Sequence, residues 1–395
     1  MRANGRTRLS ARARGLVQSD IRAMTRAVEA VGGINLGQGV CDLPTDTLVK
    51  RGAIDAIEAS RATYSVYEGI EPLRAAIAKK LREHNGLTYD PATEIMVTVG
   101  STGAFALAIM AVIDPGDAVV LFEPFYSYHV NTTSLFGGVP RFVTLRGDAF
   151  AFDENALDAA AAGAKAIVVC TPSNPSGKVF TREELAIIAR IAERHDLIVI
   201  TDEIYEYILF DGREHVSPAS IDGLRDRTIT ISGFSKTFSI TGWRLGYLAA
   251  PAEFVRSMGP LSDLVYVCPP TPLQYGALKG MDAGPEFYTG LRAEYGELRE
   301  VMAAGLDAAG LRPIVPQGAY YMLADHSAVA RANGWTTARE VANALLERTG
   351  VAAIPGSAFY SEPRDGDHLL RFCFAKPRAA LEDAARRLAK FASRS

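Results

Sequence analysis

Lys236 is the residue of this sequence best placed for covalent chemistry. It follows the apolar run Thr228–Ile231, which reads as a buried strand, at the end of the segment Ser232–Lys236. A lysine just past a buried strand has a lowered pKa because burial disfavours its charged form, and its free amine can form a Schiff base with a carbonyl. Arg244, eight residues later, could bind a phosphate through its planar guanidinium. On their own, these two residues would be read as a surface lysine and arginine in a loop.

Asp202 and Tyr205 form the second candidate group. Asp202 directly follows the aliphatic run Leu197–Thr201. An unpaired carboxylate in such a place is unfavourable, so Asp202 should face a cation or a strong donor, such as a protonated pyridine nitrogen. Tyr205, three residues on, can reach the same ligand. The alternative is a structural aspartate that caps the next segment.

Two further strand ends carry small or polar residues. The segment Gly100–Ala104 lies between a predicted strand and a predicted helix, where small residues and a helix N-terminus could bind a phosphate, although such turns are also common without one. Asn174 could donate a hydrogen bond to a ligand or belong to an ordinary Asn-Pro turn. Taken together, the strand ends supply a phosphate cradle, an acid for a ring nitrogen, a phenol, a Schiff-base lysine and an arginine. No other common cofactor than pyridoxal phosphate uses that set.

The stretches between these strand ends predict the elements that would bring them together. Apolar strands alternate with helices, and Thr181-x-x-Glu184 is a capping-box signal that opens the helix Glu183–His195. Strands that are apolar on both faces and separated by helices imply a mostly parallel sheet covered on both sides, an α/β fold. Such sheets bind ligands at the carboxyl ends of their strands. The predicted strands are Glu94–Val99, Ala118–Phe122, Lys165–Cys170, Leu197–Thr201 and Thr228–Ile231, and Ala104–Ile113 is a predicted apolar helix.

The pattern changes after about residue 280. Long helices (Pro285–Ala309 and Thr336–Thr349) flank short strands such as Ala319–Leu323 and His368–Phe374. We therefore predict a large cofactor-binding domain over residues 45–284, a smaller α+β domain made of 16–44 and 285–395, and an N-terminal arm over 1–15.

Composition excludes several classes of protein. The chain has 395 residues, 48% hydrophobic and 22% charged, with a net charge of −3, which is typical of a soluble globular protein and lacks the basic surface that nucleic acid requires. Its longest apolar run, Ala104–Ile113, is half of what a membrane span needs. The four cysteines show no CxxC spacing, so reduced thiols in a cytoplasmic protein are expected rather than zinc or disulfides. The five arginines before Asp20 suit an arm or a transit peptide; no apolar stretch for secretion follows them.

The sequence resembles the class I/II aminotransferases, which are aspartate-aminotransferase-like, fold-type-I enzymes that depend on pyridoxal phosphate. The resemblance covers nearly the whole chain and implies a seven-stranded, mostly parallel sheet. The stretch from Asp202 to Pro251 is most similar to the kynurenine/glutamine and methionine transaminase branch. The motifs are Asn35–Gly39, Tyr64 with Gly69 and Leu73-Arg74, Gly100–Ala104, Glu123–Tyr126, Asn174–Gly177, Asp202–Tyr205, Ser235-Lys236, Thr241–Gly246, Gly318–Tyr320 and Arg371-Phe372.

The resemblance implies a role for each matching residue. Lys236 would hold the cofactor and move the substrate proton, and Asp202 would keep the pyridine nitrogen protonated. Tyr205 and Asn174 would bond the ring oxygen, and Asn174 would also contact substrate. The remaining assignments are Tyr126 stacked on the ring, Ser101, Thr102, Gly103, Ser235 and Arg244 at the phosphate, Tyr64 at the phosphate of a neighbouring subunit, Arg371 clamping the substrate carboxylate, and Gly39 beside it.

Two positions depart from the family pattern. Gly233 stands where many relatives have a phosphate-binding serine, so Ser235 or Ser232 must supply that hydroxyl. Ser176 stands where threonine is usual. Both changes leave the lysine and the aspartate of the pattern in place.

The implied reaction is ping-pong transfer of an amino group from an L-amino acid to a 2-oxo acid by a homodimer with shared sites. One alternative is a lyase on the same fold, such as a β-eliminating, decarboxylating or cyclising enzyme. A second is a non-catalytic effector-binding regulator, for which the roughly 30 residues before the core are too few to form a winged helix. A third is a structural protein with a dead site, which the complete residue set disfavours. Val40, Tyr126, Tyr320 and Phe359 would accept aromatic or long aliphatic substrates, or else belong to the core.

Overall fold

A seven-stranded sheet forms the centre of the protein. The computed structural model describes residue 10 and residues 20–392, so all but one residue of the predicted arm lies outside the described part. The strand order is β2-β8-β7-β6-β5-β3-β4; β8 is antiparallel to β2 and β7, and the other neighbouring pairs are parallel. The strands are β2 (Ile95–Val99), β3 (Ala118–Glu123), β4 (Val139–Thr144), β5 (Ala166–Cys170), β6 (Ile198–Asp202), β7 (Thr228–Gly233) and β8 (Leu245–Ala249).

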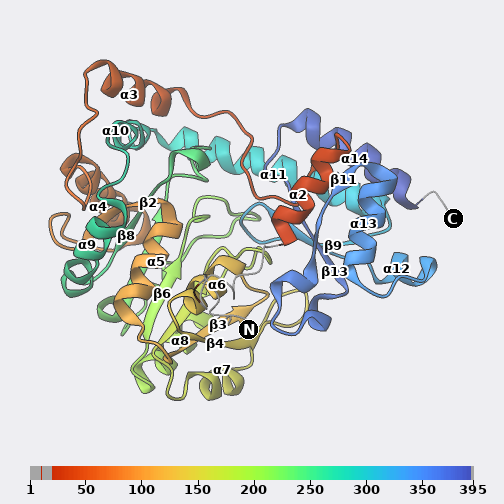
Figure 1. Ribbon diagram of the computed structural model, residues 1–395, viewed down its shortest axis with the longest axis horizontal. Coiled ribbons are helices and arrows are strands. Elements are labelled where there is room, and N and C mark those ends of the chain that lie inside the picture. The colour runs from red at the N-terminus through yellow and green to blue at the C-terminus, as the bar shows by residue number, and fades with distance from the viewer. Residues whose placement is uncertain (1–9, 11–19, 393–395) are drawn as a thin grey trace, which may run out of the picture.

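Helices cover both faces of this sheet (Figure 1) because its strands are apolar on both sides. Alternate side chains of a strand point to opposite faces, so Val119 and Leu121 pack in one layer while Val120 and Phe122 pack in another. The first layer contains α5 (Gly100–Val112) and α9 (Ala252–Tyr266). The opposite face is covered by α4 (Glu71–Asn85), α7 (Glu154–Ala161), α8 (Arg182–Arg194) and α10 (Thr271–Gly280).

Most predicted elements are confirmed within one or two residues, and the mostly parallel α/β fold is confirmed with them. The capping box that opens α8 is present: Thr181 accepts from the backbone N–H of Glu184, whose side chain accepts from the N–H of Thr181. Two strands of the large sheet were not predicted. β4 is a partly exposed edge strand that contains Pro140 and Arg141, and β8 contains Gly246, so neither reads as an apolar run.

Two smaller sheets follow (Figure 1). A four-stranded antiparallel sheet has the order β12-β13-β10-β9, and β1 pairs in parallel with β11. Their strands are β1 (Ile34–Asn35), β9 (Arg312–Ile314), β10 (Tyr321–Asp325), β11 (Val351–Ala352), β12 (Ile354–Pro355) and β13 (Leu369–Cys373). The other helices are α2 (Asp20–Ala30), α3 (Thr47–Glu58), α6 (Ser127–Leu135), α11 (Pro285–Ala308), α12 (Ser327–Asn333), α13 (Ala338–Thr349) and α14 (Arg378–Ala392).

Helix α2 packs against β11 and β12, and the segment after β1 leads from there to the edge of the large sheet. Arg371 lies on β13, which pairs with β10 and β12. The two smaller sheets therefore bring residues 35–40 and Arg371 toward the strand ends of the large sheet. Among the described residues, we find no helix with the length and apolar character to cross a membrane.

Candidate active site

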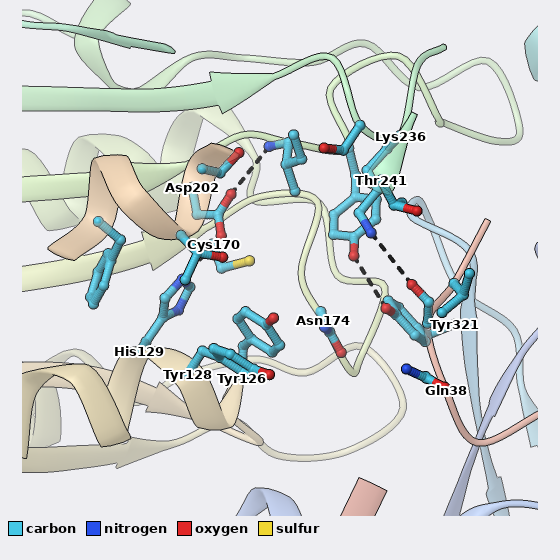
Figure 2. Close-up of a pocket in the computed structure, with 18 of the residues that line it drawn as sticks. Gln38, Tyr126, Tyr128, His129, Cys170, Asn174, Asp202, Lys236, Thr241 and Tyr321 are labelled. Carbon is cyan, nitrogen blue, oxygen red and sulfur yellow. Dashed lines mark hydrogen bonds and ion pairs between the residues drawn. The ribbon is translucent and has the colours of Figure 1, made fainter. Parts of the chain in front are cut away.

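One pocket lies at the carboxyl ends of the parallel strands, where the sequence predicted it (Figure 2). It encloses about 1050 Å³ of empty space, open solvent at its mouth included. Gly103, in the first turn of α5, and Tyr64, on the surface, do not line it. The predicted site residues that do line it are Gly39, Ser101, Thr102, Tyr126, Asn174, Asp202, Tyr205, Ser235, Lys236, Arg244 and Arg371.

Lys236 projects into this pocket from the loop that follows β7 (Figure 2). Within the described part of the chain, its amine makes one long hydrogen bond: Nζ donates to the backbone oxygen of Gly39 over 3.4 Å. The amine also lies 5.3 Å from the ring centre of Tyr320 and 5.9 Å from that of Tyr205. Burial lowers the pKa of Lys236, although the nearby Asp202 opposes this shift. The amine is therefore more readily deprotonated than an ordinary lysine, as a nucleophile or base requires.

Asp202 ends β6 and is held by a residue that the sequence did not reveal. His129 Nε2 lies 3.0 Å from Asp202 Oδ2, and both side chains are buried. His129 packs on Phe105, with ring centres 4.5 Å apart. It follows Tyr126 by three residues at the start of α6, and the two rings meet edge to face with their centres 5.2 Å apart. That spacing after the aromatic motif is the signal that could have identified His129.

Tyr205 and Tyr321 form a hydrogen-bonded pair at the side of the pocket. Their hydroxyl oxygens are 3.3 Å apart (Figure 2). Burial raises the pKa of Tyr205 well above its usual value, and burial raises that of Tyr321 to about 12. Both phenols therefore keep their protons at neutral pH and can act as hydrogen-bond donors. Tyr321, from β10, was not predicted as part of the site.

An anion cradle occupies another wall. Ser101 and Thr102 lie in the first turn of α5, where unpaired backbone N–H groups favour a negative charge. Arg244 adopts a left-handed backbone conformation (φ 55°) and donates to the Thr241 carbonyl over 2.9 Å. Its guanidinium lies so close to Gly100 that a Cβ there would be 2.5 Å from Nη2. A glycine at position 100 thus leaves room for the guanidinium beside the cradle.

The structure distinguishes between the two candidate serines. Ser232 is buried and donates to Glu206 over 2.8 Å, away from the pocket, whereas Ser235 lines the pocket. A Cβ on Gly233 would lie 2.9 Å from Gly246 Cα and 3.0 Å from Ser101 Oγ. Close packing of β7 on β8 and α5 thus leaves no room for the serine that many relatives carry at position 233.

Arg371 supplies a site for a carboxylate. It is almost completely buried, with Nη1 donating to Asn174 over 3.1 Å and Nη2 to the Gly37 carbonyl over 2.5 Å. Its Nε is buried without a partner, and its guanidinium carbon lies 4.6 Å from the ring centre of Tyr321. A guanidinium with a free N–H in a buried, apolar setting is suited to bind a carboxylate through two hydrogen bonds. Gly39 lies against Tyr321, the ring on which Arg371 also packs: a Cβ on Gly39 would lie 1.7 Å from Tyr321 Oη.

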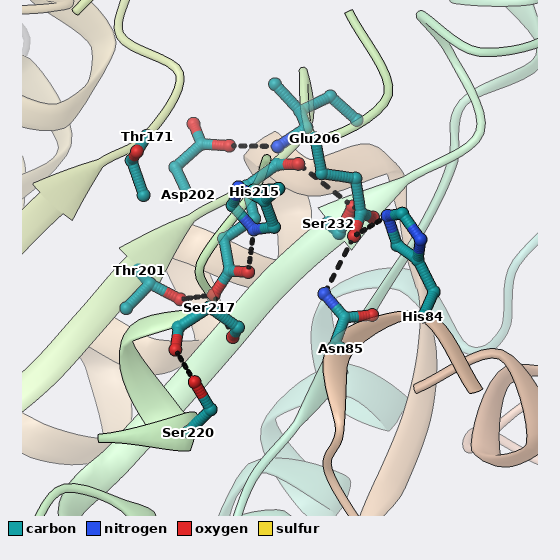
Figure 3. Close-up of polar contacts among 12 residues, drawn as sticks. His84, Asn85, Thr171, Thr201, Asp202, Glu206, His215, Ser217, Ser220 and Ser232 are labelled. Atoms are coloured by element: carbon teal, nitrogen blue, oxygen red, sulfur yellow. Dashed lines mark hydrogen bonds and ion pairs between the residues drawn. The ribbon is translucent and has the colours of Figure 1, made fainter. Parts of the chain in front are cut away.

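A buried polar network lies behind Asp202 (Figure 3). Oxygen and nitrogen atoms of Glu203, Glu206 and His215 lie within 4.8 Å of one another, a spacing that could hold a metal ion. However, Lys80 forms a buried ion pair with Glu206, and each carboxylate accepts several further hydrogen bonds. Although burial opposes it, Lys80 leads the charged groups that lower the pKa of Glu206 to about 2. Neither carboxylate therefore needs a metal ion to offset its burial.

The pocket fits pyridoxal phosphate. It places the amine of Lys236, the carboxylate of Asp202, phenol donors and an arginine-lined helix N-terminus around one space, and it leaves Arg371 Nε without a partner. These groups match an aldehyde, a ring nitrogen, a ring oxygen, a phosphate and a substrate carboxylate. Together they define an enzyme that uses a phosphorylated pyridine cofactor to act on an amino or carboxylic acid.

Comparison with known proteins identifies the family. The model for aminotransferase class I and II matches residues 31–388, and the chain belongs to that family. It is 37% identical over 383 residues to a probable N-succinyldiaminopimelate aminotransferase DapC of Mycobacterium tuberculosis, covering 94% of this chain and 95% of the relative. It is 32% identical to human kynurenine--oxoglutarate transaminase 1, covering 91% and 92%.

Solved structures agree with the fold. The N-succinyldiaminopimelate aminotransferase from Mycobacterium tuberculosis superposes with a TM-score of 0.92 at 36% identity, covering 97% of this chain and all of the other. YbdL from Escherichia coli, described with a methionine aminotransferase function, also gives 0.92 at 30% identity, with the same coverage. This chain is thus a pyridoxal-phosphate-dependent aminotransferase of fold type I, and the predicted transaminase function is favoured over the lyase alternative.

Proposed function

We propose that Lys236 is the acid–base catalyst of amino-group transfer in this chain, with Asp202, Tyr205 and Arg371 positioning the reactants. The observation that carries the proposal is the half-buried amine of Lys236, with its lowered pKa, in a pocket that also contains an aspartate and an arginine suited to a carboxylate. Pyridoxal phosphate, when bound, supplies an electron-withdrawing ring that makes the Cα proton of an amino acid removable.

The side chains divide the work as follows. Arg371 and Asn174 bind the α-carboxylate and turn the Cα–H bond toward Lys236. Lys236 Nζ would remove that proton and return it across the substrate nitrogen, two atoms from Cα. Asp202, itself held by His129, would keep a proton on the ring nitrogen, and Tyr205 would donate a hydrogen bond to the ring oxygen. A 2-oxo acid takes the amino group when the same steps run in reverse, so both substrates use one pocket in turn.

The remaining cofactor contacts are proposed on the same basis. Ser101, Thr102, Ser235 and Arg244 bind the phosphate, with Gly103 placing the first turn of α5 close to it. Tyr126 stacks on the ring. All of these except Gly103 line the pocket, which supports the assignments.

The test is the visible absorbance of the purified protein after reconstitution with pyridoxal phosphate. We expect the wild-type protein to show a cofactor absorbance band that disappears with suitable L-amino acids and returns with a 2-oxo acid. In Lys236→Ala, amino acids should leave the absorbance of the bound cofactor unconverted. Turnover by Lys236→Ala close to wild type would refute the assignment.

A second measurement concerns the apoprotein. The free amine attacks the aldehyde, and its pKa is lowered. The rate of reconstitution should therefore rise with pH, with a midpoint below the ordinary lysine pKa of 10.5. A midpoint at or above that value would contradict the burial argument.

We propose that the active unit is a homodimer with shared sites. Tyr64 is 82% exposed although the family pattern implies a phosphate contact, so it must reach a site other than that of its own chain. The end of α9 and the following turn also expose apolar side chains that a partner subunit could cover: Leu264 (84% exposed), Val265 and Val267. We expect Leu264→Glu to shift the protein toward monomers in light scattering. A wild-type monomer with full activity would refute the dimer.

We propose that residues 45–284 form the large domain and that residues 16–44 and 285–395 form the small one. The seven-stranded sheet falls wholly in the large domain, and the two smaller sheets fall in the small one.

A cytoplasmic location is proposed from the four free thiols, two of them buried, which suit a reducing compartment. The named relatives act on different amino donors, so the donor class is argued below from the pocket itself.

A further inference from the structure

The part of the pocket left for a substrate side chain carries no formal positive charge among the described residues. The charged residues that line the pocket are Asp202, Lys236, Arg244 and Arg371, and each already has a partner or a role in holding the cofactor or the α-carboxylate. A second carboxylate, as in a dicarboxylic amino acid, would find no cation of this chain to face. The selectivity of this region therefore depends on its neutral residues.

Residues 37–40 form the wall nearest the substrate. Gly37 accepts from Arg371 over 2.5 Å, and the Gly39 carbonyl lies 3.4 Å from Lys236 Nζ. A substrate whose carboxylate binds Arg371 and whose Cα lies near Lys236 must lie against this segment. Its side chain then contacts the two residues that flank Gly39, which are Gln38 and Val40, and both line the pocket.

Gln38 is held in place by an unusual set of polar contacts. Asn35 Oδ1 accepts from the backbone N–H groups of Gly37 and Gln38, each over 3.0 Å, and its Nδ2 donates to Thr25 on α2 over 3.2 Å. Thr25 in turn donates to Gln38 Oε1 over 3.4 Å. With its oxygen occupied, the amide presents Nε2 to the pocket, and Figure 2 shows that nitrogen on the side of Asn174.

We propose that Gln38 is a specificity-determining residue that donates a hydrogen bond from Nε2 to an acceptor on the substrate side chain. It favours amino donors with an uncharged side chain that carries an acceptor, such as a carboxamide. This inference rests on the proposed function. Because the half-buried amide N–H has no partner in the described part of the chain, a hydrocarbon side chain leaves it unpaired, and a pocket loses affinity when it leaves a polar group unsatisfied.

The experiment compares donors that share a shape and differ only in the side-chain end. Asparagine, aspartate and leucine form one such set, and glutamine, glutamate and homoleucine form the next longer one. Rates of band loss give kcat/KM for each donor in wild type, Gln38→Leu and Gln38→Lys. Removing one neutral hydrogen bond should lower the carboxamide-to-hydrocarbon ratio in Gln38→Leu by about three- to tenfold. Supplying a cation should raise the carboxylate-to-carboxamide ratio in Gln38→Lys by about tenfold or more.

Gln317→Leu serves as the matched control. Gln317 accepts from Val179 over 3.0 Å outside the pocket, so its loss should leave both ratios within twofold of wild type. Equal changes for all donors in Gln38→Leu, or unchanged ratios in both Gln38 variants, would overturn the proposal. The proposal would also be overturned if the wild-type kcat/KM were highest for the carboxylate donor in both sets, that is, for aspartate in the first set and for glutamate in the second.

A binding measurement separates this proposal from the function on which it rests. Succinamate, succinate and 4-methylpentanoate lack the amino group and cannot react, but they share the side-chain ends of the first set of donors. Their dissociation constants in the reconstituted protein, measured by calorimetry, should follow the same ratios and the same changes in the Gln38 variants. If the acids bind in this way but no amino acid converts the cofactor band, the proposed function fails and the role of Gln38 holds. If conversion proceeds and the acids bind alike in wild type and variants, the role of Gln38 fails alone.

Discussion

Replacing Arg371 with lysine is the sharpest test of the substrate site, because it keeps the charge and changes only the geometry. A guanidinium has five N–H donors. Two of them bond Asn174 and Gly37, and Nε is buried without a partner. The donors that remain suffice for a two-pronged bond to a carboxylate. An ammonium has three donors on a single nitrogen, so it cannot serve both protein acceptors and the carboxylate in the same arrangement.

The expected magnitude follows from the contacts that lysine cannot replace. One charge-assisted hydrogen bond contributes about 1.5–3 kcal/mol. The guanidinium also lies against two aromatic rings, with its carbon 4.6 Å from the centre of Tyr321 and 4.7 Å from that of Phe359. Such contacts contribute from about 0.5 kcal/mol at exposed sites to about 2 kcal/mol when desolvated, and an ammonium lacks the planar stacking that strengthens them here. The sum of about 2–5 kcal/mol predicts that kcat/KM falls roughly 30- to 5000-fold in Arg371→Lys.

Most of this loss should fall on KM, since the carboxylate is bound in the ground state and in the transition state alike. Single-turnover measurement of the band with increasing amino acid separates KM from kcat. The control is Arg299→Lys. Arg299 bonds both oxygens of Asp211 over 2.8 Å, far from the pocket, so its replacement should lower the melting temperature without changing KM. A KM for Arg371→Lys within threefold of wild type, with cofactor bound, would refute the reasoning.

Three further predictions follow from buried contacts. His129→Leu leaves the carboxylate of Asp202 without its 3.0 Å partner, so affinity for pyridoxal phosphate should fall about tenfold or more in spectroscopic titrations; unchanged affinity would exclude a role for this contact. The folded-state pKa of Glu206, about 2, lies below its ordinary 4.5, so its contribution to stability is present above pH 4.5 and is lost as pH falls through 2. Urea unfolding should show that the wild type loses about 3 kcal/mol of unfolding free energy between pH 4.5 and pH 2, and that Glu206→Gln does not lose this amount. Parallel curves of unfolding free energy against pH for the two proteins would contradict this prediction. Gly233→Ser, although serine is usual in relatives, should lower stability by about 1–3 kcal/mol and weaken cofactor binding, because its Cβ would meet Gly246 Cα at 2.9 Å. Wild-type melting and affinity in that variant would show that the strands can separate without loss.

The elements that the sequence predicted well are those with an unambiguous pattern. Central strands such as β5 and β6 are buried along nearly their whole length and therefore read as apolar runs. The α8 helix carries its own capping box. Strand β4 was missed because it is an edge strand, where the exposed side relaxes the need for apolar residues. Strand β8 was missed because Gly246 interrupts its apolar pattern, and glycine inside a short segment disfavours a strand assignment.

The candidate site likewise contains residues that the local sequence could indicate and residues that it could not. Lys236, Asp202 and Asn174 each follow a strand, so local sequence placed them at one edge of the sheet. His129, Tyr321 and Gln38 reach the pocket from a helix without an apolar stripe, from the antiparallel sheet and from a connecting segment. Apart from the three-residue spacing between Tyr126 and His129, no spacing in the sequence indicates that these elements meet. Likewise, the choice between Ser232 and Ser235 depended on Glu206, a buried acceptor in the turn that follows β6.

The segment around Gly37 and Gly39 links the two halves of this arrangement. Gly37 accepts from Arg371 on β13, while the Gly39 carbonyl accepts from Tyr320 over 3.1 Å and lies near Lys236. The same guanidinium that would bind the substrate therefore also holds the wall under which the substrate must lie. Binding a carboxylate at Arg371 adds a charge-assisted bond to a group already fixed by this wall, so little conformational freedom is lost at that moment. Selectivity for the rest of the substrate then falls to the side chains that this segment presents, which explains why a neutral residue such as Gln38 can decide it.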